Sequence, residues 1–174
     1  MLDACPAGVQ FSTNPCPCGF FGDARRECHC TPRQVQQYLS RISGPLLDRI
    51  DIHIEVPAIA YRDLANKQEG TSSSGMKDSV VRARLTQAKR FKNDGITANS
   101  RMSAKLIKKY CQLDEESEAL IKQAIDELGL SARAYSRIIK VARTIADMDN
   151  SIDIQVQHIS EAIQYRSLDR SRFA

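Results

Sequence analysis

Large aromatic side chains are scarce in this sequence. It contains no tryptophan, and phenylalanine and tyrosine together make up 6% of its 174 residues. Apolar residues nevertheless reach 42%, which is enough for a folded core. That core must therefore be built mainly from aliphatic side chains. A chain of this length has room for one ordinary domain or for two small ones.

Long apolar runs and a secretory pattern at the N-terminus are also lacking. No stretch approaches the roughly 20 consecutive apolar residues that a membrane-spanning helix needs. The first residues do not show a basic segment followed by an apolar one, which is typical of a signal peptide. We therefore expect a soluble, cytoplasmic protein without a membrane partner.

A third absence is the phosphate-binding loop of nucleotide hydrolases. The pattern G-x-x-x-x-G-K-[ST] does not occur, and the sequence has no Gly-Lys pair at all. The acidic pairs Asp114-Glu115 and Asp126-Glu127 lie in helical patterns, not after the apolar strand that a Mg²⁺-holding pair follows. The chain has no phosphate cradle of its own. Alone, it is not expected to bind ATP tightly or to hydrolyse it.

The charge is only mildly positive. The net charge is +4, from 25 basic and 21 acidic residues, which permits contact with nucleic acid or nucleotide without favouring it. The most basic segment is an expected helix over 76–94. Its apolar side is predicted to hold Val80, Val81, Leu85, Ala88 and Phe91, and its other side Lys77, Arg82, Arg84, Lys89, Arg90 and Lys92. A solvated surface is the commoner explanation of such a face, and a phosphate-binding face is the alternative.

Four of the six cysteines fall within fifteen residues. They are spaced C-x-C-x9-C-x-C, as Cys16, Cys18, Cys28 and Cys30. Zinc in structural sites takes four soft ligands in a tetrahedron, and two thiolate pairs on two tight turns can supply them. The spacing predicts a structural zinc site without an open position for a substrate. Reduced structural cysteines, or one oxidised pair, are the alternatives.

Residues 41–56 show a turn followed by strict alternation. Gly44-Pro45 predicts the turn. After it Ile50, Ile52, Ile54 and Val56 alternate with Asp51, His53 and Glu55, which is the pattern of a half-buried strand. A second short strand is expected from Val9 to Thr13. Arg49 would lie at the mouth of the longer strand, where a fixed cation can meet an anion.

The remaining segments predict helices. Thr31-Pro32 starts a short one, and a polar, low-complexity stretch over 57–75 reads as a flexible linker. Beyond the helix over 76–94 we expect a small bundle of four helical segments: a short one from Ser103, one that Asp114 caps and Gly129 ends, one that Ser131 caps and one over about 155–165. Their apolar stripes place Ile121, Ile138 and Ile159 inward, and Arg133, Arg137 and Lys140 share one face of the third segment. His158 is expected on a helix surface. The fold class is thus α+β, mainly α.

Three motifs in order resemble the magnesium-chelatase-like AAA+ ATPases of the ComM/YifB type. They are Asn-Pro-Cys-Pro-Cys-Gly at 14–19, Ser-Gly-Pro-Leu-Leu-Asp-Arg-Ile-Asp at 43–51 and Leu-Ser-Ala-Arg-Ala-Tyr at 130–135, supported by 142–147 and 161–166. The similarity runs from about Asn14 to Arg170 and concerns only the final third of such a protein. It implies the end of an AAA+ core with a four-cysteine knuckle over 1–56, the linker over 57–75 and a helical lid over 76–174.

The resemblance also implies roles for three polar side chains. Asn14 falls at sensor 1, which faces the γ-phosphate of ATP. Arg49 falls at the arginine finger, which acts in trans on the nucleotide of a neighbouring subunit. Arg133 falls at sensor 2, on the lid helix, contacting nucleotide in its own subunit. A strand-end asparagine, a surface arginine and an arginine of a capped helix are the plain alternatives.

For the intact protein, the resemblance implies a hexameric ring that uses ATP and Mg²⁺ and remodels DNA, for example by branch migration. The first thirteen residues depart from the family's apolar strand. We therefore expect a truncated open reading frame or an isolated part of a longer protein. The alternative is a stand-alone zinc-stabilised module that binds nucleic acid or protein through the helix over 76–94, without ATPase activity.

Overall fold

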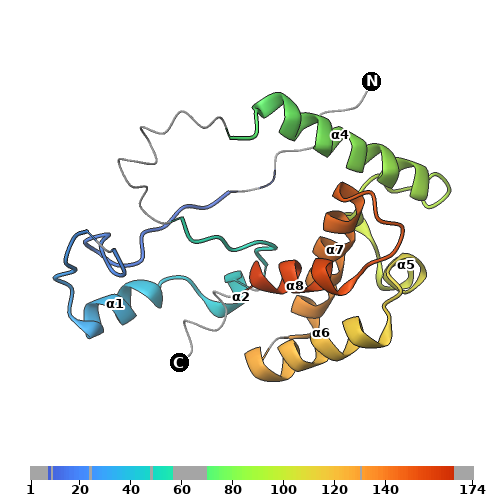
Figure 1. Ribbon diagram of the computed structural model, residues 1–174. Coiled ribbons are helices and arrows are strands. Elements are labelled where there is room, and N and C mark those ends of the chain that lie inside the picture. Colours follow the sequence, from blue (N-terminus) through green and yellow to red (C-terminus); the bar gives the residue numbers. More distant parts are fainter. Residues whose placement is uncertain are drawn as a thin grey trace. The chain divides into compact units, whose positions relative to one another are not determined.

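The computed structural model describes residues 8, 10–23, 25–47, 49–56, 70–129 and 131–166. Within these ranges it contains seven α-helices and one short 3-10 helix (Figure 1), so the prediction of a mainly helical chain is confirmed. Contacts divide the chain into two units, Met1–Ser43 and Gly44–Ala174. They are described separately below. None of the described helices is long and apolar enough to span a membrane.

The first unit contains the cysteine motif and one helix, α1, Pro32–Leu39. The helix begins where the sequence predicts. The Thr31 hydroxyl accepts from the Gln34 N–H, and the Gln34 side chain accepts from the Thr31 N–H at 2.8 Å. Among the described residues of this unit only Cys16 and Val35 are buried. Apolar packing therefore contributes little to its stability.

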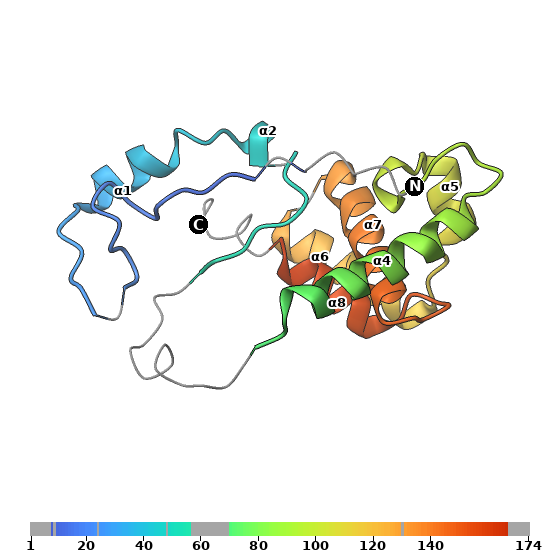
Figure 2. The same ribbon diagram turned by 90° about the horizontal axis from the view of Figure 1, so that it is seen from above.

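The second unit is a helical bundle arranged around its longest amphipathic helix, α7. Its elements are α2 Gly44–Leu47, α4 Ser73–Arg90, η1 Asn99–Arg101, α5 Ala104–Tyr110, α6 Glu115–Leu128, α7 Ala132–Met148 and α8 Val156–Gln164. Helix α7 packs against α4, η1, α5 and α8, and α8 packs against α6. Figure 1 shows α7 and α8 lying between α4 on one side and α6 on the other, and in Figure 2 α4 passes in front of α7 and α8.

The core of the bundle is mainly aliphatic, as the scarcity of aromatic residues predicts. Its buried members are Phe91, Met102, Cys111, Ile121, Ile138, Ile139, Ala142, Ile154, Ile159 and Ala162. Phe91 meets the Tyr110 ring edge-on, with 5.4 Å between centroids and 85° between ring planes. The predicted apolar stripes of α6, α7 and α8 supply Ile121, Ile138 and Ile159 to this core.

The helix ends are determined by local chemistry and confirm the predictions. The side chains of Ser103, Asp114 and Ser131 each accept the backbone N–H three residues further on. Gly129 ends α6 in a left-handed conformation, with φ 61°, which glycine adopts without a steric penalty.

The predicted inner face of α4 is correct only in part: Phe91, at the end of the helix, is 1% exposed as expected. The helix starts at Ser73, inside the stretch interpreted as a linker, and the rest of that stretch, 57–69, lies outside the described residues. Val80 and Leu85 were expected inside but are 51% and 46% exposed, whereas Gln87 is buried. The helix therefore packs through a partly polar face.

A buried polar cluster explains this choice of face. The Asp147 carboxylate accepts from Arg90 Nη1 at 2.8 Å, from Asn99 Nδ2 at 2.8 Å and from Arg143 Nε at 3.1 Å. Gln87 Oε1 accepts the Asn99 N–H at 3.3 Å. Because buried polar groups must be hydrogen-bonded, α4 turns its Gln87 and Arg90 towards Asp147. Arg90 is thus withdrawn from the basic surface to which the sequence assigned it.

The strand predicted over 50–56 is not formed in the structure. The His53 N–H donates to Tyr165 O at 2.8 Å, at the end of helix α8. Ile54 and Val56, expected inside, are 66% and 83% exposed, whereas His53, expected outside, is only 7% exposed. Burial therefore does not follow the predicted alternation. A period-two pattern gives a strand only where another strand pairs with it. The described residues contain no strand to do so.

Three further expectations concern the strand at residues 9–13, the exposure of His158 and the domain boundaries. Residues 10–13 of the expected strand at Val9 to Thr13 form no strand, while Val9 itself lies outside the described residues. His158, expected on a surface, is 1% exposed; its Nδ1 accepts the Gln155 N–H at 3.0 Å and so caps α8. The division at 56 and 75 stays a prediction. Contacts place the residues that follow Ser43 with the bundle.

Candidate functional site

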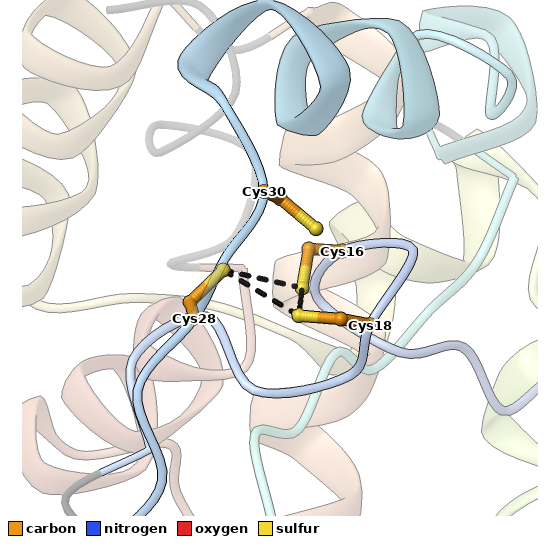
Figure 3. Close-up of side chains that lie close together, drawn as sticks. All are labelled: Cys16, Cys18, Cys28 and Cys30. Carbon is orange, nitrogen blue, oxygen red and sulfur yellow. Dashed lines mark hydrogen bonds between the residues drawn. The ribbon is translucent and has the colours of Figure 1, made fainter.

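The four predicted cysteines form one cluster in the first unit. Their sulfurs all lie within 4.8 Å of one another. The measured separations are 3.3 Å for Cys16–Cys18, 3.7 Å for Cys16–Cys28 and 3.6 Å for Cys18–Cys28, and Cys30 completes the group just before α1 (Figure 3). Four sulfurs held tetrahedrally about 2.3 Å from a zinc ion would lie about 3.8 Å apart. The cluster can therefore hold a metal ion with little movement.

Backbone N–H groups and neighbouring thiols shift the pKa values of the four cysteines. The tight turn at Gly19, with φ 85°, brings its N–H to 3.1 Å from Cys16 O. The Phe20 N–H and neighbouring thiols lower the pKa of Cys18 to about 6, whereas burial and the neighbouring thiols raise the pKa values of Cys28 and Cys30, so Cys18 ionises first. Metals bind the thiolate form. The other donors are the N–H groups of Phe21 and Gly19 to Cys16, of Cys30 to Cys28 and of Cys18 to Cys30.

The loop between the two cysteine pairs is held by its own hydrogen bonds. Asp23 Oδ1 accepts the N–H of Arg25 at 2.7 Å and that of Arg26 at 3.3 Å. The Arg26 guanidinium stacks 5.1 Å from the centre of the Phe20 ring. Both arginines are exposed. The two turns are therefore connected by an ordered loop, which favours a preformed site.

Asn14, the predicted sensor 1, lies beside this knuckle. Its side chain is exposed, and its Cγ would be 3.8 Å from a Cβ added at Gly19. Asn14 belongs to the first unit, whereas Arg49 and Arg133 belong to the second. The structure therefore relates the two arginines to each other and not to Asn14.

Arg133, the predicted sensor 2, lines a groove along α7 in the second unit. The groove has a volume of about 860 Å³. Arg133, Arg137 and Lys140 lie on its basic side, at the spacings of four and three that place residues on one helix face. Its apolar lining includes Val141, Ile145 and Met148 from α7 and Ile52 and Ile54 from the segment after Arg49. Asp51 and Glu161 also line the groove, and Asp51 pairs with Arg137, so the lining carries charges of both signs beside an apolar part.

Arg49, the predicted finger, follows the one-turn helix α2. Its N–H donates to Leu46 O at 3.0 Å, and its exposed guanidinium has Nη1 3.5 Å from Pro45 O. Its own carbonyl accepts Arg137 Nη1 at 3.0 Å, and Arg137 also pairs with Asp51. The backbone at Arg49 is thus attached to α7, while the cationic end is open to solvent.

Sequence reasoning missed the residues that hold this segment. Arg137 was noticed only as a member of a shared helix face. Arg166, whose Nη1 donates to Ile50 O, was not singled out at all, although its side chain is 1% exposed. Their partners, two backbone carbonyls and the Asp51 carboxylate, are distant in the sequence. Spacing patterns contain no signal for such contacts.

These features define a small helical domain with an exposed arginine near its start, preceded by a four-cysteine knuckle. Residues 70–166 match the family model described as magnesium chelatase, subunit ChlI C-terminal. Residues 4–64 match the one described as magnesium chelatase, subunit ChlI. The first match covers more than half of the chain, and the chain belongs to this magnesium chelatase family.

Relatives of the ComM/YifB type agree with this membership, so the resemblance seen in the motifs is confirmed. The chain is 40% identical over 169 residues to uncharacterized proteins YifB of Salmonella typhimurium and Escherichia coli. It is 36% identical over 168 residues to competence protein ComM of Haemophilus influenzae. Each match covers 95% of this chain but 32% of the relative. The chain thus spans about a third of the length of these relatives.

Proposed function

We propose that this chain is the C-terminal part of an AAA+ ATPase of the magnesium-chelatase type. It would contribute side chains to nucleotide sites whose phosphate-binding loop lies elsewhere in the complete assembly. One observation carries the proposal. Arg49 has an exposed guanidinium on a firmly held backbone, in the same unit as the basic groove that Arg133 lines.

The proposed role of Arg49 is that of an arginine finger. A guanidinium that must reach the γ-phosphate of ATP in a neighbouring subunit has to be exposed, and it also needs a fixed base. Arg49 meets both requirements. At the site it would stabilise the charge that develops on the transferred phosphoryl group.

Arg133 and Asn14 are proposed as the two sensors. Arg133 is the second residue of α7, where the positive end of the helix dipole adds to its own charge and favours phosphate. Asn14 precedes the cysteine turn that would hold it near nucleotide. ATP phosphates would thus meet Arg49, Arg133 and Asn14. We assign no residue of this chain to Mg²⁺.

The cysteine cluster is proposed to hold a structural zinc ion through Cys16, Cys18, Cys28 and Cys30. The sulfur separations and the N–H donors at each sulfur fit four thiolates around one ion. Four protein ligands leave no position for a substrate. The ion would join the two turns and so fix the polypeptide around Asn14.

For the complete protein we propose a hexameric ring in the cytoplasm that remodels DNA at the expense of ATP, for example by branch migration. The name of the Haemophilus influenzae relative, a competence protein, is consistent with work on DNA. The alternative of a stand-alone binding module is supported by the exposed cations Lys77, Arg82, Lys89 and Lys92 on or next to α4. Salt-dependent DNA binding by this chain alone would favour that alternative.

Mixing subunits tests the trans role directly. An intact relative whose own finger arginine is replaced by alanine would be mixed with this chain, and ATP hydrolysis would be measured. Adding the wild-type chain should raise the rate of ATP hydrolysis, and adding the Arg49→Ala variant should not. Native mass spectrometry must first show that both chains join the ring equally. If mixed rings form and Arg49 makes no difference to hydrolysis, the finger assignment fails.

A further inference from the structure

Four of the five residues from Arg49 to His53 are held by α7 or by residues at the end of α8, far along the chain. The Arg49 carbonyl and the Asp51 carboxylate are both bound by Arg137 of α7. The Ile50 carbonyl is bound by Arg166, and the His53 N–H donates to Tyr165 O at 2.8 Å. We call residues 49–53 the finger segment. It is docked on the end of α8 and on the basic side of α7.

Arg137 is the partner that can be removed with least damage to the core. Its side chain is 27% exposed and that of Asp51 is 56% exposed, so neither is part of the apolar cluster. Arg166, by contrast, is 1% exposed. One guanidinium that hydrogen-bonds both the Arg49 carbonyl and the Asp51 carboxylate fixes the orientation of this segment as well as its distance from α7.

We propose that Arg137, through its pair with Asp51, is a positioning residue for Arg49. A catalytic cation has to be held to a fraction of an ångström to act on a phosphoryl group. The finger itself makes few contacts that could fix it. The proposal rests on the proposed function of Arg49. It adds that α7, the helix that also carries Arg133, holds the backbone at Arg49. The two arginines would then move together as one rigid body.

Amide exchange in this chain tests the docking without any nucleotide. The His53 N–H is hydrogen-bonded only when the finger segment lies against the end of α8, so its exchange rate, followed by NMR, reports release. Arg137→Gln should speed exchange by about three- to tenfold, the equivalent of one lost hydrogen bond of ordinary net strength, because the pair is partly exposed. An unchanged rate would overturn the proposal.

Lys140→Gln is the matched control. It removes one positive charge from the same face of α7, but the Lys140 Nζ donates to Ser100 O at 2.9 Å and not to the finger segment. Exchange at His53 should therefore stay at the wild-type rate. Equal acceleration by both variants would mean that the charge of the helix matters and the specific pair does not, which also overturns the proposal.

A double-mutant cycle separates pairing from a general structural effect. Asp51→Asn should accelerate exchange less than Arg137→Gln, which also loses the bond to the Arg49 carbonyl, and the double variant should be no faster than Arg137→Gln alone. Additive effects would show that the two side chains act independently. Thermal midpoints of all variants confirm that the bundle stays folded.

The catalytic consequence is measured in an intact relative whose C-terminal third is replaced by this chain. Arg49→Ala should lower kcat, and Arg137→Gln should lower it in the same direction with little change in the KM for ATP. A normal kcat for Arg137→Gln beside an impaired Arg49→Ala overturns the positioning role. A normal kcat for Arg49→Ala refutes the proposed function instead, and the exchange experiment still decides whether Arg137 docks the segment.

Discussion

The two units of the chain are stabilised in different ways. The first has two buried side chains among its described residues and four thiols grouped within 4.8 Å. The second has a cluster of ten buried residues and a buried polar network. A unit without an apolar core needs another source of stability. Metal removal and core mutation should therefore act on different parts of the molecule.

The largest effect is expected from loss of the metal. Metal binding contributes about 10–16 kcal/mol to small structural zinc modules, and the first unit has little else to replace it. Cys16→Ser, or a strong chelator, should abolish zinc binding and remove the ordered structure around the cysteines. Zinc content by elemental analysis and NMR spectra of residues 14–31 provide the measurement.

Cys111→Ser serves as the control for that prediction. Cys111 is a buried thiol of the second unit, its Sγ 4.0 Å from Met102 Sδ, and burial raises its pKa to about 11. The variant should lower the stability of the bundle and leave the zinc content unchanged. Equal loss of zinc in both variants would contradict the separation of the two units.

The next largest effect concerns the polar network of the bundle. Asp147→Ala leaves Arg143 buried without its carboxylate, and breaking a buried pair in this way costs about 3–5 kcal/mol. Urea denaturation of the second unit should show this loss with zinc content intact. Asp126→Ala, at an exposed position of α6, should change the unfolding free energy little. Similar losses in both would mean that the network does not stabilise the fold.

Truncation of a core side chain should lower the free energy of unfolding slightly less than Asp147→Ala does. Ile159 is fully buried, and replacing it with alanine removes apolar contacts and leaves a cavity, at a cost of about 3 kcal/mol. Ile152 is 89% exposed, so Ile152→Ala should be nearly neutral. Denaturation curves of the two variants compare buried and exposed isoleucine directly. Loss of zinc in Ile159→Ala would contradict the expectation that the two units are stabilised separately.

The smallest effect is a pH dependence at the start of α6. Hydrogen bonds from the side chain and backbone of Ser117 lower the pKa of Asp114. A lowered folded-state pKa stabilises the fold above the unfolded value of about 3.9 and ceases to do so as pH falls through the folded value. Asp114→Asn keeps a capping side chain that does not titrate. Its thermal midpoint should therefore fall less than that of the wild type between pH 7 and pH 3.

The parts of the fold that local chemistry determines could be predicted from the sequence. Thr31, Asp114 and Ser131 cap helices, and Gly129 ends one, because these residues act on backbone groups within a few positions. The cysteine cluster was predictable for the same reason, since its spacing alone allows four sulfurs to meet. The burial of Asp147 in a polar cluster could not be predicted in this way. An aspartate at its place in a helical pattern looks like a surface residue.

Contacts distant in the sequence account for the other failures. The alternation over 50–56 indicated a strand, but helix ends and not another strand hold this segment. His53 and His158 were expected outside because histidine is polar, and both are buried. The roles of Asn14, Arg49 and Arg133 came from family motifs. They remain predictions.

The most direct test of the central claim is ATP hydrolysis by an intact relative that carries this chain as its C-terminal third. Arg49→Ala is compared with Arg41→Ala, a change at another exposed arginine whose guanidinium lies 5.9 Å from the Tyr38 ring. An arginine finger contributes about a thousandfold or more to turnover. We expect Arg49→Ala to lose ATP hydrolysis on that scale and Arg41→Ala to keep it. Full activity of correctly assembled Arg49→Ala rings would contradict the role of Arg49 as an arginine finger.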